Sequence, residues 1–127
     1  MSKKLFSVLT ALVLMLSLSA LATAKGSKKA QDKVTLTGNI LDVACSASNN
    51  TAEKASSHKK GCSLSERCLK SGLGVYADGK FTAFDEAGTA KAKEALEKTA
   101  KPNGAKFKVM GKMAGDKLMV ESISEVE

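Results

Sequence analysis

All three cysteines of the chain and its only histidine fall in one stretch, between Cys45 and Cys68. Thiolate and imidazole groups are the ligands that zinc and copper(I) prefer in proteins. The candidate metal site is this Cys₃His set, made of Cys45, His58, Cys62 and Cys68. Asp42 precedes the first cysteine by three residues and is a further candidate, either to orient a ligand or to cap a turn. The spacing lacks the paired C-x₂-C knuckle of common zinc sites, so a copper or zinc site is the alternative to a structural disulfide.

The N-terminus has the three parts of a secretory signal peptide. Lys3 and Lys4 form a positive start, residues 5–21 are almost all apolar or small, and Ala22-Thr23-Ala24 is an A-x-A cleavage site. The apolar run is short for a membrane span and is interrupted by serine and threonine. We therefore expect residues 1–24 to be removed and the protein to be exported, to the periplasm or outside the cell, with no membrane span after cleavage.

Cleavage would leave 103 of the 127 residues, the length of one small domain. Residues 25–32 lack an apolar period and predict a flexible tether, while residues 33–127 form the expected domain. The signal carries two lysines, so the net charge falls from +7 to +5 on cleavage. The chain has no run of five like charges, and the mature part has too few aromatic residues for a base-stacking surface. We expect a monomer that does not bind nucleic acid.

Cysteines in an oxidising compartment are first interpreted as disulfide partners, and three cysteines leave one thiol unpaired. A helix expected to begin at Ser63 places Cys62 and Cys68 about 9 Å apart, beyond the span of about 7 Å that a disulfide allows. The remaining pairs join Cys45 to Cys68 or to Cys62. We prefer Cys45–Cys68, because Cys68 shares the inward face of that helix with Leu64.

Only one pair of residues, Cys62 and His58, could act as a nucleophile and its base. The spare thiol would lie near a helix N-terminus, where thiols become more reactive, so a thiol-redox protein is the second alternative. His58 lies in a polar stretch with nothing in the sequence to hold it, and nucleophile–base geometry is the first requirement of catalysis. We therefore predict a non-enzymatic protein.

The sequence of the first part of the expected domain predicts a strand, a loop and a helix. Apolar and polar residues alternate over residues 34–41, which predicts a strand that bends at Gly38 and continues to Cys45. Residues 46–61 contain no apolar residue larger than alanine and predict an exposed loop. Ser63 and Glu66 form a capping box, which predicts a helix of about two turns ending at Gly72.

The sequence of the second part predicts two pairs of strands with a helix between them. The Asp78-Gly79 dipeptide predicts a type I′ hairpin, because both of its central positions need a positive φ. The helix is rich in alanine and carries glutamate–lysine pairs four residues apart. The expected elements are strands over 75–77 and 80–85, a helix over 88–101, and strands over 106–113 and 118–124.

This order of elements predicts a mostly β domain with two helices. A five-stranded barrel with its main helix between the third and fourth strands has the order of an OB fold. Here a short helix is inserted between the first and second strands. An open α+β sheet is the alternative that the same elements allow.

The pattern D-x₂-C…H…C…C resembles a group of small exported bacterial proteins with an OB-like barrel and mostly unassigned function. The residues that carry the resemblance are Gly38, Asp42, Cys45, His58, Cys62, Cys68, Val109 and Gly111. The resemblance covers nearly the whole mature chain and implies the fold and the compartment, but no activity.

The sequence as a whole predicts an exported, non-enzymatic binding or accessory domain stabilised by the Cys45–Cys68 disulfide and without a cofactor. Its partner would be a small ligand or a protein that the sequence does not identify. The first alternative is a periplasmic copper- or zinc-binding protein that uses the cysteines and His58. The second is a thiol-redox protein that uses Cys62.

Overall fold

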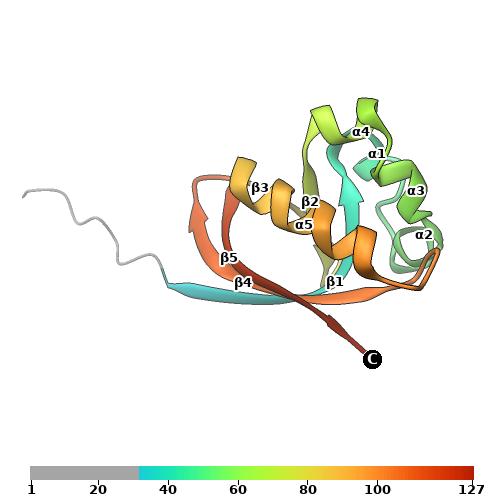
Figure 1. Ribbon diagram of the computed structural model, residues 1–127. Helices are drawn as coiled ribbons and strands as arrows, with labels where there is room; N and C mark the ends of the chain where they lie inside the picture. The colour runs from blue at the N-terminus through green and yellow to red at the C-terminus, as the bar shows by residue number, and fades with distance from the viewer. Residues whose placement is uncertain (1–31) are drawn as a thin grey trace, which may run out of the picture.

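The computed structural model describes residues 32–127, so the expected signal peptide and nearly all of the expected tether lie outside the described residues. The described part is mostly β, with a five-stranded mixed sheet closed into a ring and five helices around it (Figure 1). The ring closes in the order β1-β2-β3-β5-β4. The predicted predominance of β structure is confirmed, and the closure of the sheet excludes the open-sheet alternative.

Neighbouring strands of the ring are antiparallel at every contact except one. The strands are β1 (Lys33–Asp42), β2 (Leu73–Ala77), β3 (Lys80–Phe84), β4 (Lys106–Ala114) and β5 (Lys117–Val126). A short parallel contact between β3 and β5, at Ala83 and Phe84, closes the ring. The first half of β1 pairs with β4 and its second half pairs with β2, so this one strand belongs to both sides of the ring.

The change of partner along β1 occurs at Gly38. This residue pairs with Phe107 of β4, whereas the next residue, Asn39, pairs with Tyr76 of β2. A Cβ atom at position 38 would lie 1.8 Å from the carbonyl oxygen of Tyr76, so the strand passes here only because the residue is glycine. The predicted bend is confirmed, and Figure 1 shows the curve of β1.

The second half of the domain follows the sequence-based prediction closely. Asp78 and Gly79 both have a positive φ, as a type I′ turn between β2 and β3 requires. Helix α5 (Glu86–Lys98) begins two residues earlier and ends three residues earlier than predicted. Its start is fixed by Asp85, whose side chain accepts a hydrogen bond from the backbone N–H of Gly88 at 2.9 Å. The helix packs against β5, β2 and β3.

Four short helices occupy the connection between β1 and β2, where the sequence predicted one loop and one helix. They gather on one side of the ring, beside the end of β1 (Figure 1). They are α1 (Val43–Ser46), α2 (Ala52–Ser57), α3 (Lys60–Ser63) and α4 (Glu66–Ser71). The predicted exposed loop is therefore wrong, because Ala55 of α2 is buried against Leu41 and Tyr76. Ala55 is the buried residue of this otherwise polar helix.

Two further predictions for this connection are wrong. The first strand ends at Asp42 and not at Cys45, because the Asp42 side chain caps α1. The capping box is also absent, since Ser63 is the last residue of α3 and Ser65 precedes α4 as its N-cap. The predicted stop at Gly72 is confirmed, with a φ of 92°.

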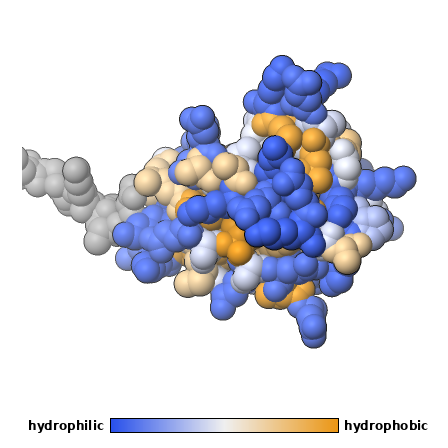
Figure 2. Space-filling view, viewed as in Figure 1, coloured by the Kyte–Doolittle hydropathy of each residue, from blue (hydrophilic) through white to orange (hydrophobic). Residues whose placement is uncertain are grey.

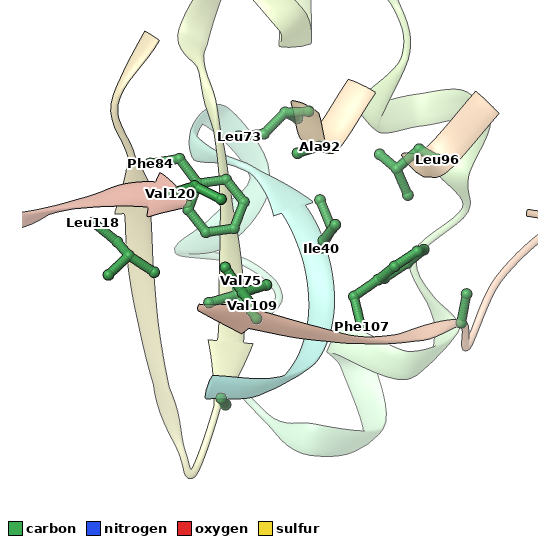
Figure 3. Close-up of a cluster of buried hydrophobic side chains, with 12 residues drawn as sticks. Ile40, Leu73, Val75, Phe84, Ala92, Leu96, Phe107, Val109, Leu118 and Val120 are labelled. Atoms are coloured by element: carbon green, nitrogen blue, oxygen red, sulfur yellow. The ribbon is translucent and has the colours of Figure 1, made fainter. Parts of the chain in front are cut away.

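One apolar core fills the ring and extends under α5. Figure 3 shows side chains from all five strands converging on the interior, with Ala92 and Leu96 of α5 above them. Phe107, Leu73, Val75, Val109 and Leu118 are almost fully buried. The end of β1 is held by its pairing with β2, and it carries the buried side chain of Asp42.

The surface is largely hydrophilic on the face shown in Figure 2, where apolar residues form small separate areas. Within residues 32–127, the exposed large apolar side chains are those of Val43 and Met119. No helix in this part of the chain has the length and hydrophobicity that crossing a membrane requires.

Candidate metal centre

Asp42, at the junction of β1 and α1, is the organising residue of the site. Its side chain is fully buried, and its Oδ2 accepts a hydrogen bond from the backbone N–H of Cys45 at 3.0 Å. This contact satisfies a free N–H of the first turn of α1 and turns the chain so that the Cys45 side chain comes back toward the carboxylate.

His58 reaches the same carboxylate from the end of α2. Its Nε2 lies 3.0 Å from Oδ1 of Asp42 and 3.1 Å from Oγ of Ser63. The Ser63 hydroxyl also donates to Oδ1 of Asp42 at 3.2 Å, and its side chain is fully buried. These three residues, which come from three separate elements, form one closed hydrogen-bonded network.

The segment that carries His58 is held against the body of the domain, which corrects our prediction that nothing fixes it. The backbones of Lys59 and Asn103 form an isolated antiparallel β-bridge, and the Lys60 backbone N–H donates to the carbonyl oxygen of Pro102 at 2.9 Å. The Lys60 ammonium also donates to the carbonyl oxygen of Thr99. As a result, the imidazole side chain is only 9% exposed.

The three thiols surround the same carboxylate. The sulfur atoms of Cys45 and Cys62 lie within 4.8 Å of a carboxylate oxygen of Asp42, and Cys68 is near enough to contribute to the lowered pKa of Asp42. All three cysteines are free; Cys62 is exposed, Cys45 half-buried and Cys68 buried. The Cys45–Cys68 disulfide that we predicted is not formed here, because the sulfur atoms lie near one another but not at bonding distance. The pairing stays a prediction.

Cys62 and Cys68 do not lie in one continuous helix, so their predicted separation of about 9 Å is based on a wrong element. Cys62 lies in α3 and Cys68 in α4, with Leu64 and Ser65 between the two helices. The spacing of a continuous helix therefore does not apply, and Cys68 is near enough to contribute to the raised pKa of Cys62.

The electrostatics of the cluster are dominated by one buried carboxylate. Burial raises the pKa of Asp42, but hydrogen bonds from Cys45, Cys68 and His58 outweigh this effect, and the net pKa lies below the ordinary value. The hydrogen bond to Asp42 and burial raise the pKa of Cys45 to about 12. Burial, followed by the charges of Cys68 and Asp42, also raises the pKa of Cys62. Without a cation, these thiols stay protonated at neutral pH.

Four of these side chains bring donor atoms together as a metal site requires. One donor atom from each residue lies within 4.8 Å of the other three, and the residues are Asp42, Cys45, His58 and Cys62. Donors bound to one tetrahedral zinc lie about 3.3–3.8 Å apart, so the most widely separated of the four need to approach one another by about 1 Å. Cys68 is outside this group of four, although its thiol contacts Asp42 and Cys62.

The set therefore differs from the Cys₃His set proposed from the sequence. Three of its four members are retained, namely Cys45, His58 and Cys62, and Asp42 takes the place of Cys68. Ser63 was missed as a site residue because its position before Leu64 and three residues ahead of Glu66 looked like an N-cap. No local sequence signal marks it as a buried partner of His58.

The Asp42–His58–Ser63 network is not a catalytic triad. In a triad, the carboxylate and the serine bind opposite nitrogens of the imidazole, so that the ring passes a proton between them. Here both oxygens face the same atom, Nε2, and the Ser63 hydroxyl is shielded from solvent. The arrangement can hold an imidazole in place, but it cannot activate the serine.

Comparison with known proteins gives no relative from which a role for these residues could be taken: no protein-family model, curated protein or solved structure matches this chain. A role for these residues therefore has to be inferred from the geometry of the site itself.

Proposed function

We propose that this protein is an exported, non-enzymatic metal-binding domain that holds one zinc(II) or copper(I) ion at Asp42, Cys45, His58 and Cys62. The single observation that carries the proposal is the convergence of one oxygen, one nitrogen and two sulfur donors within 4.8 Å. Two thiolates and an imidazole suit both ions, and a carboxylate as fourth ligand favours zinc.

Charge is a second support. Asp42 is fully buried, and within residues 32–127 its only ion-pairing partner is His58, with no lysine or arginine beside it. Two thiolates next to this carboxylate would repel one another strongly unless a cation lay between them. A bound metal ion would supply that charge and would release the thiol protons.

The surrounding scaffold is suited to such a site. Asp42 lies at the end of β1, where its pairing with Leu73 of β2 limits its movement, and Cys45 lies three residues further on in α1. His58 is held in place by two hydrogen bonds at Nε2, and this atom exchanges them for the ion when the site is filled.

We further propose that the ring is an OB-like barrel. Its strand order, the parallel contact of β3 with β5 and the position of α5 between β3 and β4 all support this assignment. Export, a monomeric state and the relationship to the small exported bacterial proteins are proposals that depend on the sequence features described above.

The test is native mass spectrometry of the mature protein, reduced without a chelating reagent and offered zinc(II) or copper(I). We expect one ion per chain for the wild type. We expect an affinity at least about 100-fold lower for the double variant Cys45→Ser, Cys62→Ser, measured by competition with a chromophoric chelator. Asp116→Asn, a change in an exposed turn, is the matched control and should bind like the wild type.

Equal affinity of the wild type and the double variant would contradict the proposal, because the ion would then be held elsewhere. Absence of binding to either ion would also contradict it. In that case the protein would be a binding or accessory domain for an organic ligand or a protein.

A further inference from the structure

The donor group includes two thiols whose own chemistry competes with metal binding. Cys45 and Cys62 belong to the same set of donors, so their two sulfur atoms lie within 4.8 Å of each other. They come from different short helices, α1 and α3, and not from the strands of the ring. A small movement of either helix would bring the sulfur atoms to bonding distance without rearranging the core.

We infer that oxidation of Cys45 and Cys62 to a disulfide releases the metal ion, so that the thiol redox state regulates occupancy of the site. This inference rests on the proposed function. The oxidant is a small-molecule disulfide, R–S–S–R. One Cys thiolate attacks it and expels R–S⁻, and the second Cys thiolate then attacks the mixed disulfide and expels another R–S⁻. The metal loses both sulfur ligands and leaves as a cation, so two electrons pass from the protein thiolates to the reagent.

Accessibility selects this pair among the three cysteines. Cys62 is exposed and Cys45 is half-buried, so an oxidant in solution reaches Cys62 first and Cys45 lies beside it to complete the bond. Cys68 is buried, so its thiol is the least accessible of the three to an oxidant in solution. The expected pair therefore differs from the Cys45–Cys68 pair predicted from the sequence.

After the disulfide forms, Asp42 and His58 are the two donors that remain. Asp42 and His58 keep their mutual hydrogen bond of 3.0 Å when the two sulfurs are lost. A carboxylate and an imidazole that already bind each other are a weak site for zinc. The oxidised form should therefore be folded but unable to retain the ion.

The experiment uses reduced protein loaded with one zinc ion and treated with oxidised glutathione. Zinc release is followed with a chromophoric chelator, and disulfides are mapped by mass spectrometry after alkylation and proteolysis. We expect one zinc released for each Cys45–Cys62 disulfide formed, and recovery of binding after reduction. Cys62→Ser should form no such disulfide, whereas Cys68→Ser should form it as the wild type does.

Two results would overturn the inference: a disulfide that leaves zinc bound, or a stable pair that involves Cys68. The same disulfide mapping on metal-free protein separates this failure from failure of the proposed function. If the reduced protein never binds zinc or copper(I), the proposed function fails, whatever disulfide the thiols form.

Discussion

The buried carboxylate of Asp42 joins the fold to the candidate site, and its removal should be costly. Its Oδ2 caps α1 through the Cys45 N–H, while its Oδ1 accepts from Ser63 and faces Nε2 of His58. In Asp42→Ala, all of these groups lose their acceptor at a position without access to water.

The size of the effect can be worked from these contacts. Loss of the cap costs about 1 kcal/mol. Ser63 and His58 lie 3.1 Å apart and can pair with each other, so we count one further unsatisfied buried group, at about 1–3 kcal/mol. The total is about 2–4 kcal/mol, a large share of the roughly 5–15 kcal/mol that stabilises a typical domain.

The assay is urea unfolding of the reduced, metal-free protein, followed by circular dichroism. Asp42→Asn keeps one oxygen acceptor and should lose about half as much free energy of unfolding as Asp42→Ala. The exposed Asp116→Ala should stay within about 0.5 kcal/mol of the wild type. An Asp42→Ala variant as stable as that control would refute the role given to the carboxylate.

Three further predictions test other parts of the account. The pKa of Cys45 is raised to about 12, so metal binding must remove the proton of its thiol. Zinc affinity, measured by competition with a chelator, should therefore rise from about pH 6 to about pH 8. An affinity that stays constant over this range would contradict the role of the thiol as a ligand. Gly38→Ala places a Cβ 1.8 Å from the Tyr76 carbonyl oxygen and should cost about 3 kcal/mol or more in urea unfolding. Gly61→Ala, with open space around it, is its control, and equal stability of the two variants would be evidence against the tight crossing. Phe107→Ala should lower the free energy of unfolding by about 3–5 kcal/mol, and a loss under 1 kcal/mol would show that this ring is not part of the core.

The strands were predictable because each has a strong local signal. Alternation of apolar and polar residues marked β1 and β4, and the Asp78-Gly79 dipeptide marked the turn between β2 and β3. Gly38 was recognised as a bend because a glycine inside a strand has few other uses.

The connection between β1 and β2 was not predictable in the same way. Its helices are four to six residues long, too short for an apolar period to develop, and tertiary contacts hold them in place. Ala55 docks α2 into a pocket made by residues distant in the sequence, and Lys59 pairs with Asn103. Nothing within the segment encodes these contacts.

The candidate site was predictable in its residue types but not in its geometry. The clustering of three cysteines and one histidine pointed to a metal or a disulfide, and Asp42 was noted as a possible partner. Asp42 and Ser63 are both fully buried and hydrogen bonded to each other although 21 residues separate them, a contact that no local pattern encodes. A helix assumed to be continuous placed Cys62 and Cys68 too far apart.

The most direct test of the central claim is X-ray absorption spectroscopy of the protein loaded with one equivalent of zinc. We predict that the zinc has both kinds of neighbour, with sulfur at about 2.3 Å and nitrogen and oxygen at about 2.0–2.1 Å. The sulfur contribution should disappear in the double variant Cys45→Ser, Cys62→Ser. A wild-type spectrum with only nitrogen and oxygen around the metal would contradict the proposed site.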